Sequence, residues 1–372
     1  MIDQDELAAW LRLLETPKLG RESARRLLAA FGSAQAVMAS TVDERREVVG
    51  SVQAAALEAP LDSFDTLLAS TLSWLTTAEV EPRDVIVLGD PGYPQALLES
   101  GDPPLLLYVQ GRIELLHAES LAVVGSRNPT PQGSANARSF SAQLSEAGLT
   151  IVSGLAMGVD GAAHEGGLDG TGSTIAVVGT GLDRVYPHRH LALAHRIASQ
   201  GLIVSEYSLG TPPLALHFPA RNRIIAGLAR GTLVIEAVLK SGSLITARLA
   251  SECGREVFAI PGSIHSPQSR GCHALIRQGA KLVETAGDIL EELKLPLRAT
   301  MPARIDGNAP TPEAPASDPL LDALGFEPIT LDALVARTGW PAGELNSRLL
   351  DLELDGQVAR LPGQLFQRIA HG

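Results

Sequence analysis

The spacing of hydrophobic residues changes along the chain, and the changes predict where its elements lie. In residues 5–40 and again in 42–78, apolar side chains recur every three or four positions, which predicts short amphipathic helices. Trp74 is expected to pack against the interior of this helical part. We therefore predict a helical domain over residues 1–80.

One turn in this part has a recognisable form. A Pro-x-Leu-Gly turn at 17–20, followed by a helix and Phe31-Gly-Ser, resembles a helix-hairpin-helix or SAM-like module. Some modules of this kind hold a DNA backbone through the turn. The surrounding acidic residues favour the alternative, a small domain that packs against the rest of the chain or contacts protein.

Beyond residue 80 the pattern changes to short β-branched runs that alternate with helical segments. The predicted strands are DVIVLGD, LLLYVQG, LAVVGSR, TIVSGLA, TIAVVGTG, LIVSE, TLVIEA, EVFAIPG and AKLVET. Helices are predicted over 132–147, 159–168, 190–198, 245–253 and 272–277. The alternation predicts an α/β domain over residues 81–295, a doubly wound, mainly parallel sheet whose ligands bind beyond the carboxyl ends of the strands.

The last part of the chain, from residue 296 on, differs from the rest in composition and periodicity. Residues 296–317 are rich in Pro and Ala with little periodicity, and we interpret them as a linker. Residues 318–372 show three amphipathic helices and a short hairpin, the layout of a winged helix. Its third helix, 342–354, carries Arg348 but more acids than bases, so protein contact is favoured over DNA reading.

Charge is unevenly distributed along the chain. The net charge is −12, with about −10 in residues 1–119, about +2 in 120–295 and about −4 in the remainder. Nucleic acid, if bound, should therefore lie in a local groove of the middle segment. Aromatic residues make up only 4% of the chain, so few rings are available to stack on bases.

The first residues, the length of the apolar runs and the spacing of the two cysteines indicate where the protein is located and whether its cysteines are paired. The acidic first residues do not resemble a signal peptide, and no apolar run has the length of a membrane span. Cys253 and Cys272 lack the spacing of a metal site or a disulfide framework. We expect a cytosolic protein that has no membrane partner.

Three predicted strands end in glycine-rich turns: Gly125-Ser126-Arg127, residues 153–158 and residues 179–183. Glycine lets the backbone approach an anion closely, and free N–H groups can hold it. None of the turns matches the dinucleotide or P-loop pattern, so neither a nucleotide cofactor nor ATP hydrolysis is expected. A single turn of this kind is explained by tight strand–helix packing, whereas several in one sheet favour an anion groove.

The segment LHFPARNRIIAG, residues 216–227, reads as a loop that enters a helix with two arginines at the entry. Free N–H groups and the helix dipole suit a phosphate there, and arginine adds a planar fork of donors. The alternative is an arginine pair bound to carboxylates of the same chain. The anion interpretation requires Arg127 to lie near Arg221 and Arg223, with all three free of buried acids.

Taken together, these motifs resemble one protein family. GSR at 125–127, SGLAMGVDGAAHEGGL at 153–168, GTGLDRVYPHRH at 179–190, FPARNRIIAGLA at 218–229 and EAVLKSGSLITARLA at 236–250 are similar to the DprA/Smf family. The resemblance implies an extended Rossmann-like fold with a SAM-like N-terminal domain and a C-terminal winged helix. It also implies single-stranded DNA binding, loading of the RecA recombinase during natural transformation, and a homodimer, with no cofactor or metal.

The resemblance also implies which residues contact DNA and which form a dimer or RecA contact. Its DNA contacts carry over to Gly125, Ser126, Arg127, Arg189, Phe218, Arg221, Asn222 and Arg223. Phe218 is the nearest ring for a base, a contact of about 1–3 kcal/mol. The family's usual Lys is missing between 210 and 218, and His190 replaces the usual Asn. A dimer or RecA contact is implied around 271–283, through His273, Leu275, Ile276 and Leu282, although core packing explains the apolar residues equally well.

The alternatives to a DNA-binding protein are an enzyme and a protein-only scaffold. Asp160 with His164, or His188 with His190, could form an acid–base or metal pair, but capping or packing is the milder explanation. A Rossmann-type N-glycosidic hydrolase would use Glu206, Glu236 and Asp183. The chain lacks the PGGxGT loop of such enzymes, so we expect no catalysis.

Overall fold

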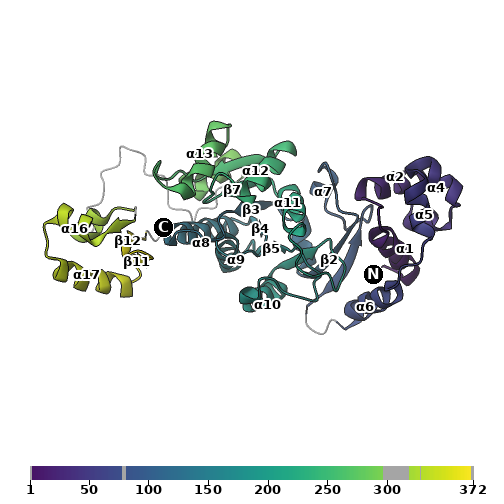
Figure 1. Cartoon of the computed structure of the whole chain (residues 1–372), viewed down its shortest axis with the longest axis horizontal. Helices are drawn as coiled ribbons and strands as arrows, with labels where there is room; N and C mark the ends of the chain where they lie inside the picture. Colours follow the sequence, from purple (N-terminus) through teal and green to yellow (C-terminus); the bar gives the residue numbers. More distant parts are fainter. Residues whose placement is uncertain (1, 78–80, 296–317, 327, 370–372) are drawn as a thin grey trace.

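The computed structural model describes residues 2–77, 81–295, 318–326 and 328–369. The molecule is elongated, with a central sheet, N-terminal helices at one end and a small C-terminal unit at the other (Figure 1). The predicted linker over 296–317 lies outside the described residues.

The central sheet has nine strands in the order β1-β2-β6-β5-β4-β3-β7-β8-β9. The seven strands from β6 to β9 run parallel, whereas β2 is antiparallel to both of its neighbours. The predicted doubly wound, mainly parallel sheet is therefore confirmed, with an antiparallel extension at one edge. The bounds are β1 (Arg83–Val87), β2 (Leu106–Gly111), β3 (Ser120–Val124), β4 (Thr150–Ser153), β5 (Thr174–Val177), β6 (Leu202–Ser205), β7 (Gly231–Val234), β8 (Glu256–Ala259) and β9 (Lys281–Leu282).

Helices cover both faces of this sheet, and the alternation within β3 shows how. Leu121 and Val123 pack with α8 (Pro131–Glu146), α9 (Val159–Asp169) and α14 (Ala286–Glu292). Ala122 and Val124 face the opposite way, toward α11 (His217–Leu228) and α12 (Gly242–Glu252). Successive side chains of a strand point to opposite faces of the sheet. Because helices cover both faces here, apolar residues occupy every position, which explains the continuous apolar runs. The other helices are α7 (Gln95–Leu98), α10 (Leu191–Gln200) and α13 (Arg270–Arg277).

The chain passes from β3 outward to β6 and then returns through α11 to β7, on the other side of β3. The strand order therefore reverses between β3 and β7. In open α/β sheets the crevice at such a reversal, beyond the carboxyl ends of the strands, is the usual ligand site. Loops 125–130 and 235–241 lie at this reversal.

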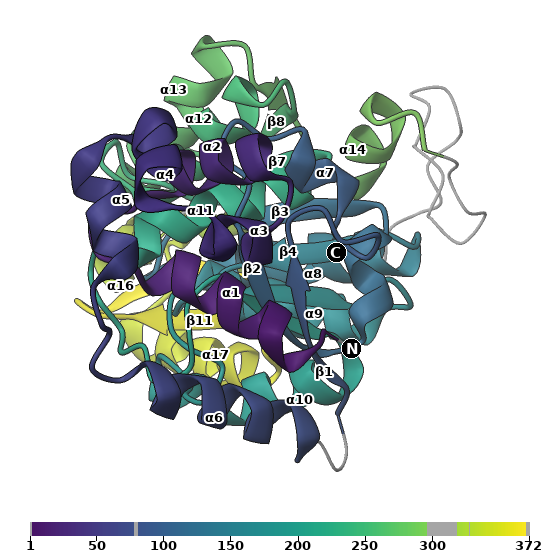
Figure 2. The same cartoon turned by 90° about the vertical axis from the view of Figure 1, so that its right-hand side faces the viewer.

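The N-terminal helices do not have a core of their own. Their apolar residues share one cluster with β1 and β2, and Trp74 meets the edge of Tyr108 at 5.9 Å between ring centroids. The predicted packing of Trp74 is confirmed. Figure 2 shows these helices in front of the sheet edge. Their bounds are α1 (Gln4–Glu15), α2 (Arg21–Phe31), α3 (Ala34–Ala39), α4 (Val42–Val49), α5 (Ser51–Glu58) and α6 (Phe64–Thr76).

The C-terminal unit is the predicted winged helix. Three helices and a three-stranded sheet in the order β10-β12-β11 enclose a separate apolar cluster. The exposed side of α17 carries Leu350 and Leu354 beside acidic residues. The bounds are α15 (Pro319–Leu324), β10 (Ile329–Thr330), α16 (Leu331–Thr338), α17 (Ala342–Leu354), β11 (Val358–Leu361) and β12 (Leu365–Arg368).

A bilayer-crossing helix would need a long, apolar run, and none of the helices within the described ranges has one.

Candidate nucleic-acid interface

The turns that follow β3 and β4 touch each other. The N–H of Val159 donates to the Ser126 carbonyl at 3.1 Å, and a Cβ at Gly125 would lie 2.7 Å from the Val159 side chain. Gly158 has φ +83° and packs directly on the Ser126 and Arg127 carbonyls. Glycine is therefore required at both positions, and the two turns form one continuous edge at the end of the sheet.

Arg127 projects from this edge into solvent. Its guanidinium carbon lies 5.9 Å from the centroid of the Phe218 ring, and it forms no ion pair with any residue that the structure describes. The N–H groups of Ser126 and Arg127 likewise donate to no acceptor within the described ranges. An unpaired guanidinium beside two open amides is an arrangement that binds an anionic oxygen.

Helix α11 starts earlier than the sequence predicts. It begins at His217, so Phe218 and Pro219 belong to its first turn, and the two arginines lie in its second turn. Proline is tolerated in a first turn because the missing N–H has no intrahelical partner there. The prediction that Arg221 and Arg223 flank the helix entry is therefore wrong.

Arg221 points inward. Its side chain is 4% exposed, its Nη1 donates to the Val177 carbonyl, and its guanidinium fills the space where a Cβ of Gly154 would lie. Burial lowers the pKa of Arg221, and the nearby charge of Asp160 opposes this effect. The predicted phosphate contact of Arg221 is contradicted by this burial.

Asp160 completes the support of the turn after β4. Its Oδ2 accepts from the N–H groups of Gly154 at 3.1 Å and Ala156 at 3.3 Å. The Asp160 carboxylate thus hydrogen-bonds this turn, while the buried Arg221 guanidinium fills the space beneath Gly154. This pair shapes the edge on which Arg127 sits.

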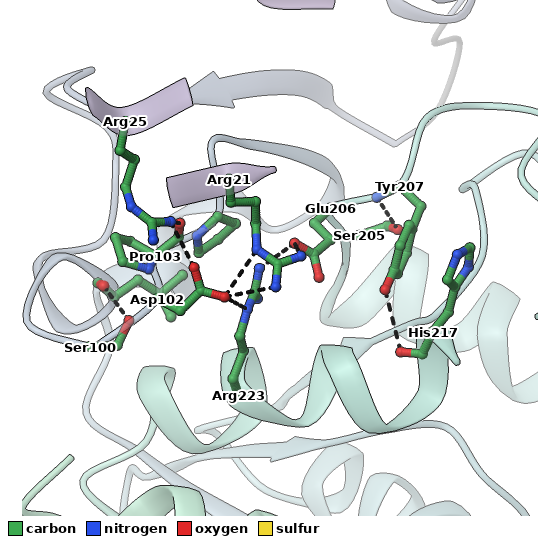
Figure 3. Close-up of polar contacts among 12 residues, drawn as sticks. Arg21, Arg25, Ser100, Asp102, Pro103, Ser205, Glu206, Tyr207, His217 and Arg223 are labelled. Atoms are coloured by element: carbon green, nitrogen blue, oxygen red, sulfur yellow. Dashed lines mark hydrogen bonds and ion pairs between the residues drawn. The ribbon is translucent and has the colours of Figure 1, made fainter. Parts of the chain in front are cut away.

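Arg223 is bound to acids of the same chain (Figure 3). Its Nε donates to Asp102 Oδ2 at 2.8 Å, and its Nη2 pairs with Glu206. Its side chain is only 11% exposed. The expectation that Arg223 grips a phosphate is therefore corrected: the alternative of an arginine bound to carboxylates holds here. The groove of three free arginines required by the sequence interpretation is contradicted, and of the three only Arg127 remains exposed.

Asp102 receives two further arginines, both from α2. Arg21 and Arg25 each approach one of its oxygens at 2.7 Å. Although burial opposes it, hydrogen bonding and charge from these arginines and from Arg223 hold the pKa of Asp102 well below its usual range. One carboxylate thus joins the N-terminal helices to α11.

The first turn of α11 is also tied to the loop after β5. His217 Nδ1 lies 3.2 Å from the Gly179 carbonyl, and its ring stacks on Tyr207 at 3.9 Å between centroids. The Tyr207 hydroxyl donates to the His217 carbonyl at 3.4 Å. These contacts fix the direction in which the next residue, Phe218, leaves the helix.

The Asp160–His164 pair is explained by packing contacts. His164 is fully buried, and its Nε2 accepts from the N–H of Leu155 at 3.2 Å while its Nδ1 faces Thr174 Oγ1 at 2.7 Å. Burial lowers the pKa of His164 to about 3. Leu155 has φ +57°, so the histidine holds a strained residue in place. No cluster of three potential metal ligands occurs among the described residues.

The three acids of the hydrolase alternative have structural partners. Glu236 accepts from the Thr130 N–H at 2.9 Å and from its hydroxyl at 2.6 Å. Thr130 caps α8, so the Glu236 carboxylate occupies the helix end where a Rossmann fold usually places a nucleotide phosphate. Glu206 pairs with Arg223, and Asp183 accepts from the Gly210 N–H at 2.8 Å.

The remaining predicted residues differ in their surroundings. Arg189 is exposed in the turn η2 (His188–His190) and has no ion pair within the described part of the chain. Asn222 reaches the Gly242 carbonyl at 3.5 Å. Tyr186, which the sequence analysis did not select, lies 5.4 Å from Phe218 between ring centroids. The sequence did contain a signal for Tyr186, because this residue directly precedes Pro187 in the GTGLDRVYPHRH motif.

The predicted dimer or RecA contact lies on α13 and β9. His273, Ile276 and Leu282 line a surface cavity of about 580 Å³, and Leu282 is 44% exposed. Leu275 packs partly into the central core. Leu282 is therefore exposed, unlike an ordinary core residue. Core packing explains Leu275.

Family models match the three parts of the chain. The model described as DNA recombination-mediator protein A matches residues 84–294, a DprA-like N-terminal HHH domain matches 4–44, and a DprA winged helix domain matches 306–364. The chain belongs to the DNA recombination-mediator protein A family. The resemblance to DprA/Smf proteins is confirmed. Members of this family act in DNA processing and recombination.

Similar proteins cover most of the chain. It is 44% identical to protein Smf of Escherichia coli over 307 residues, 80% of this chain and 79% of that protein. It is 51% identical to DNA processing protein DprA of Streptococcus pneumoniae over 205 residues, 55% of this chain and 72% of the relative. The crystal structure of the Streptococcus pneumoniae protein matches with TM-score 0.67 and 39% identity, covering 78% of this chain and 98% of that one.

A second solved structure connects the fold to a ligand. DNA processing protein A of Helicobacter pylori, described for its single-stranded DNA binding mode, matches with TM-score 0.51 and 33% identity. It covers 57% of this chain and 96% of that one. The solved structures thus share the fold over part of the chain, and the family models match its central domain and both flanking units.

Replacing Asp102 by Ala should lower the free energy of unfolding by about 2 kcal/mol or more. Three arginines would lose their common partner, and Arg223 would keep a largely buried charge. Urea unfolding measures the change. Asp169→Ala is the matched control, because its pair with Arg138 is exposed and should cost well under about 1 kcal/mol. Equal losses in the two variants would contradict a special role for Asp102.

Replacing His164 by Gln should flatten the acid side of the stability profile. The folded pKa of His164 is about 3, below the ordinary 6.5, so only the unfolded chain takes up this proton between those values. Stability is complete above pH 6.5 and falls by about 1.4 kcal/mol per pH unit below it. Urea unfolding at several pH values tests this. Exposed His195→Gln should leave the slope unchanged, and an unchanged slope in His164→Gln would refute the assignment.

Proposed function

We propose that this chain binds single-stranded DNA without strong sequence preference, through the edge formed by the turns after β3 and β4. One observation carries this proposal. Arg127 is exposed and has no ion-pair partner among the residues that the structure describes, and the N–H groups of Ser126 and Arg127 donate to no described acceptor. The edge lies near the reversal of strand order, where ligands of such sheets bind. The described DNA binding of the Helicobacter pylori relative supports the proposal.

Few cationic side chains are exposed at this edge. Arg221 and Arg223 are internal, and the segment 210–218 has no Lys. Arg127 and Arg189 are the two predicted contact arginines that remain exposed. The number of phosphate contacts, and with it the salt dependence of affinity, should therefore be small. A net charge of −12 adds repulsion away from the edge.

We further propose that the chain loads RecA onto incoming DNA during natural transformation and works in the cytoplasm. Membership of the recombination-mediator family supports this part of the proposal. A strand-exchange assay with RecA and DNA coated by a single-strand-binding protein tests it: the chain should stimulate exchange. No stimulation would refute RecA loading and leave DNA binding standing.

Catalysis is not favoured by any contact at the site. The acids that a nucleotide hydrolase would use hold Arg223, the Gly210 N–H and the start of α8. Each of these carboxylates therefore has a structural partner within the described part of the chain. The DNA-binding proposal therefore uses the site without a bond-breaking step.

Replacing Arg127 by Ala should weaken binding of single-stranded DNA and make it less sensitive to salt. One lost phosphate contact lowers the log–log salt slope by about 0.7. Fluorescence anisotropy with a labelled oligothymidylate, measured across salt concentrations, gives both quantities. Arg46→Ala, an exposed arginine of the N-terminal helices, is the control and should change neither. Affinity and slope equal to the unaltered chain would refute the proposed edge.

We also propose that the chain forms a homodimer through α13 and β9, so replacing Leu282 by Arg should convert it into monomers. Leu282 is an exposed apolar residue beside Ile276 at a surface cavity, and a charge there would be buried on association. Light scattering after size-exclusion chromatography measures the mass. Leu354→Arg is the control, because Leu354 is 79% exposed on the winged helix. A dimer that survives Leu282→Arg would place the interface elsewhere.

A further inference from the structure

Tyr186 is an aromatic side chain left open at the proposed edge. Its side chain is 50% exposed, whereas Trp10, Tyr93 and Tyr108 are each at most 5% exposed. A single exposed ring is ordinary on a protein surface and carries no meaning alone. Its neighbours give it meaning, because the ring touches Phe218 at the edge where Arg127 projects.

The geometry of the ring pair decides which ring is open to a base. The Tyr186 and Phe218 centroids are 5.4 Å apart with planes tilted by 40°. Aromatic side chains whose centroids are about 4.5–7 Å apart are in direct contact with each other. No base therefore fits between them. Phe218 is half-buried and has the Arg127 guanidinium 5.9 Å from its ring centroid, so Tyr186 is the more exposed ring of the two.

Cations lie on both sides of this ring along the chain. Arg184 precedes it, in a weak exposed pair with Asp183 at 3.3 Å, and exposed Arg189 follows it. Arg127 reaches the other ring of the pair. An exposed ring with arginines around it is the usual composition of a single-strand binding surface, in which bases stack and phosphates meet the charges.

We propose that Tyr186 is the base-stacking residue of this chain, taking one nucleobase on its open face while Arg127 and Arg189 hold neighbouring phosphates. The inference rests on the proposed single-stranded DNA binding and deepens it. Phe218 then acts as the support of the Tyr186 ring, and the base contact first expected of Phe218 moves to its neighbour.

The test compares Tyr186→Phe and Tyr186→Leu in the full chain. Phenylalanine keeps a ring, and leucine keeps apolar bulk without one. Binding of oligothymidylate should be nearly unchanged in Tyr186→Phe and about 10-fold weaker in Tyr186→Leu. The salt slope should stay constant in both, because no phosphate contact is lost. Phe326→Leu, a 52% exposed ring on the winged helix, is the matched control.

An abasic oligonucleotide of the same length gives the decisive comparison. The unaltered chain should bind it about 10-fold more weakly than oligothymidylate, and Tyr186→Leu should bind the two alike. A base preference that persists in Tyr186→Leu, with the fold confirmed by thermal unfolding, overturns this inference alone. Failure of the unaltered chain to bind any oligonucleotide overturns the proposed function and the inference with it.

Discussion

The arrangement of the proposed edge depends on two buried guanidiniums in one turn of α11. Residues two apart on a helix point in nearly opposite directions, so Arg221 and Arg223 reach different partners. Arg221 lies beneath the turn after β4, and Arg223 reaches the acids that face the N-terminal helices. A buried charge must find a partner, and each partner fixes one more segment. The helix is consequently held from two sides.

This constraint explains why the edge can be well formed with few exposed cations. Asp160, Arg221 and His164 set the backbone of residues 154–156, and His217 sets the start of α11. The exposed groups then need little rearrangement to meet a ligand. Binding loses less free energy when loops and side chains are already ordered. Internal arginines thus position the proposed edge without reaching its surface.

The sequence predicted the elements well because their signals are local. Apolar runs, glycine turns and helical spacing identified the strands and the order of helices over 81–295, and the winged helix followed from the same patterns. The direction of β2 was not predictable, since a run of apolar residues looks alike in either direction. The motif around Arg221 and Arg223 showed which residue types were present and could not show where they pointed.

The misreading of Arg223 has a definite cause. Its partner Asp102 lies 121 residues earlier in the chain, in a segment whose position at α11 only the fold reveals. Arg21 and Arg25 are four apart on α2, so their shared face was visible, yet nothing local indicated an acid opposite them. Tyr186 was not selected for a related reason, because the Phe218 ring that it contacts lies in another segment of the chain.

The distinction between single and double strands places a further demand on this edge. Arginine and backbone N–H groups bind phosphates, and both forms of DNA present phosphates. A ring can stack on a base only when that base has left its neighbours, which a duplex resists. Any preference for single strands must therefore reside in the contact that reaches a base face. Under the proposed function that contact is the Tyr186–Phe218 pair of the described edge, so the rings would supply the selectivity and the cations the attraction.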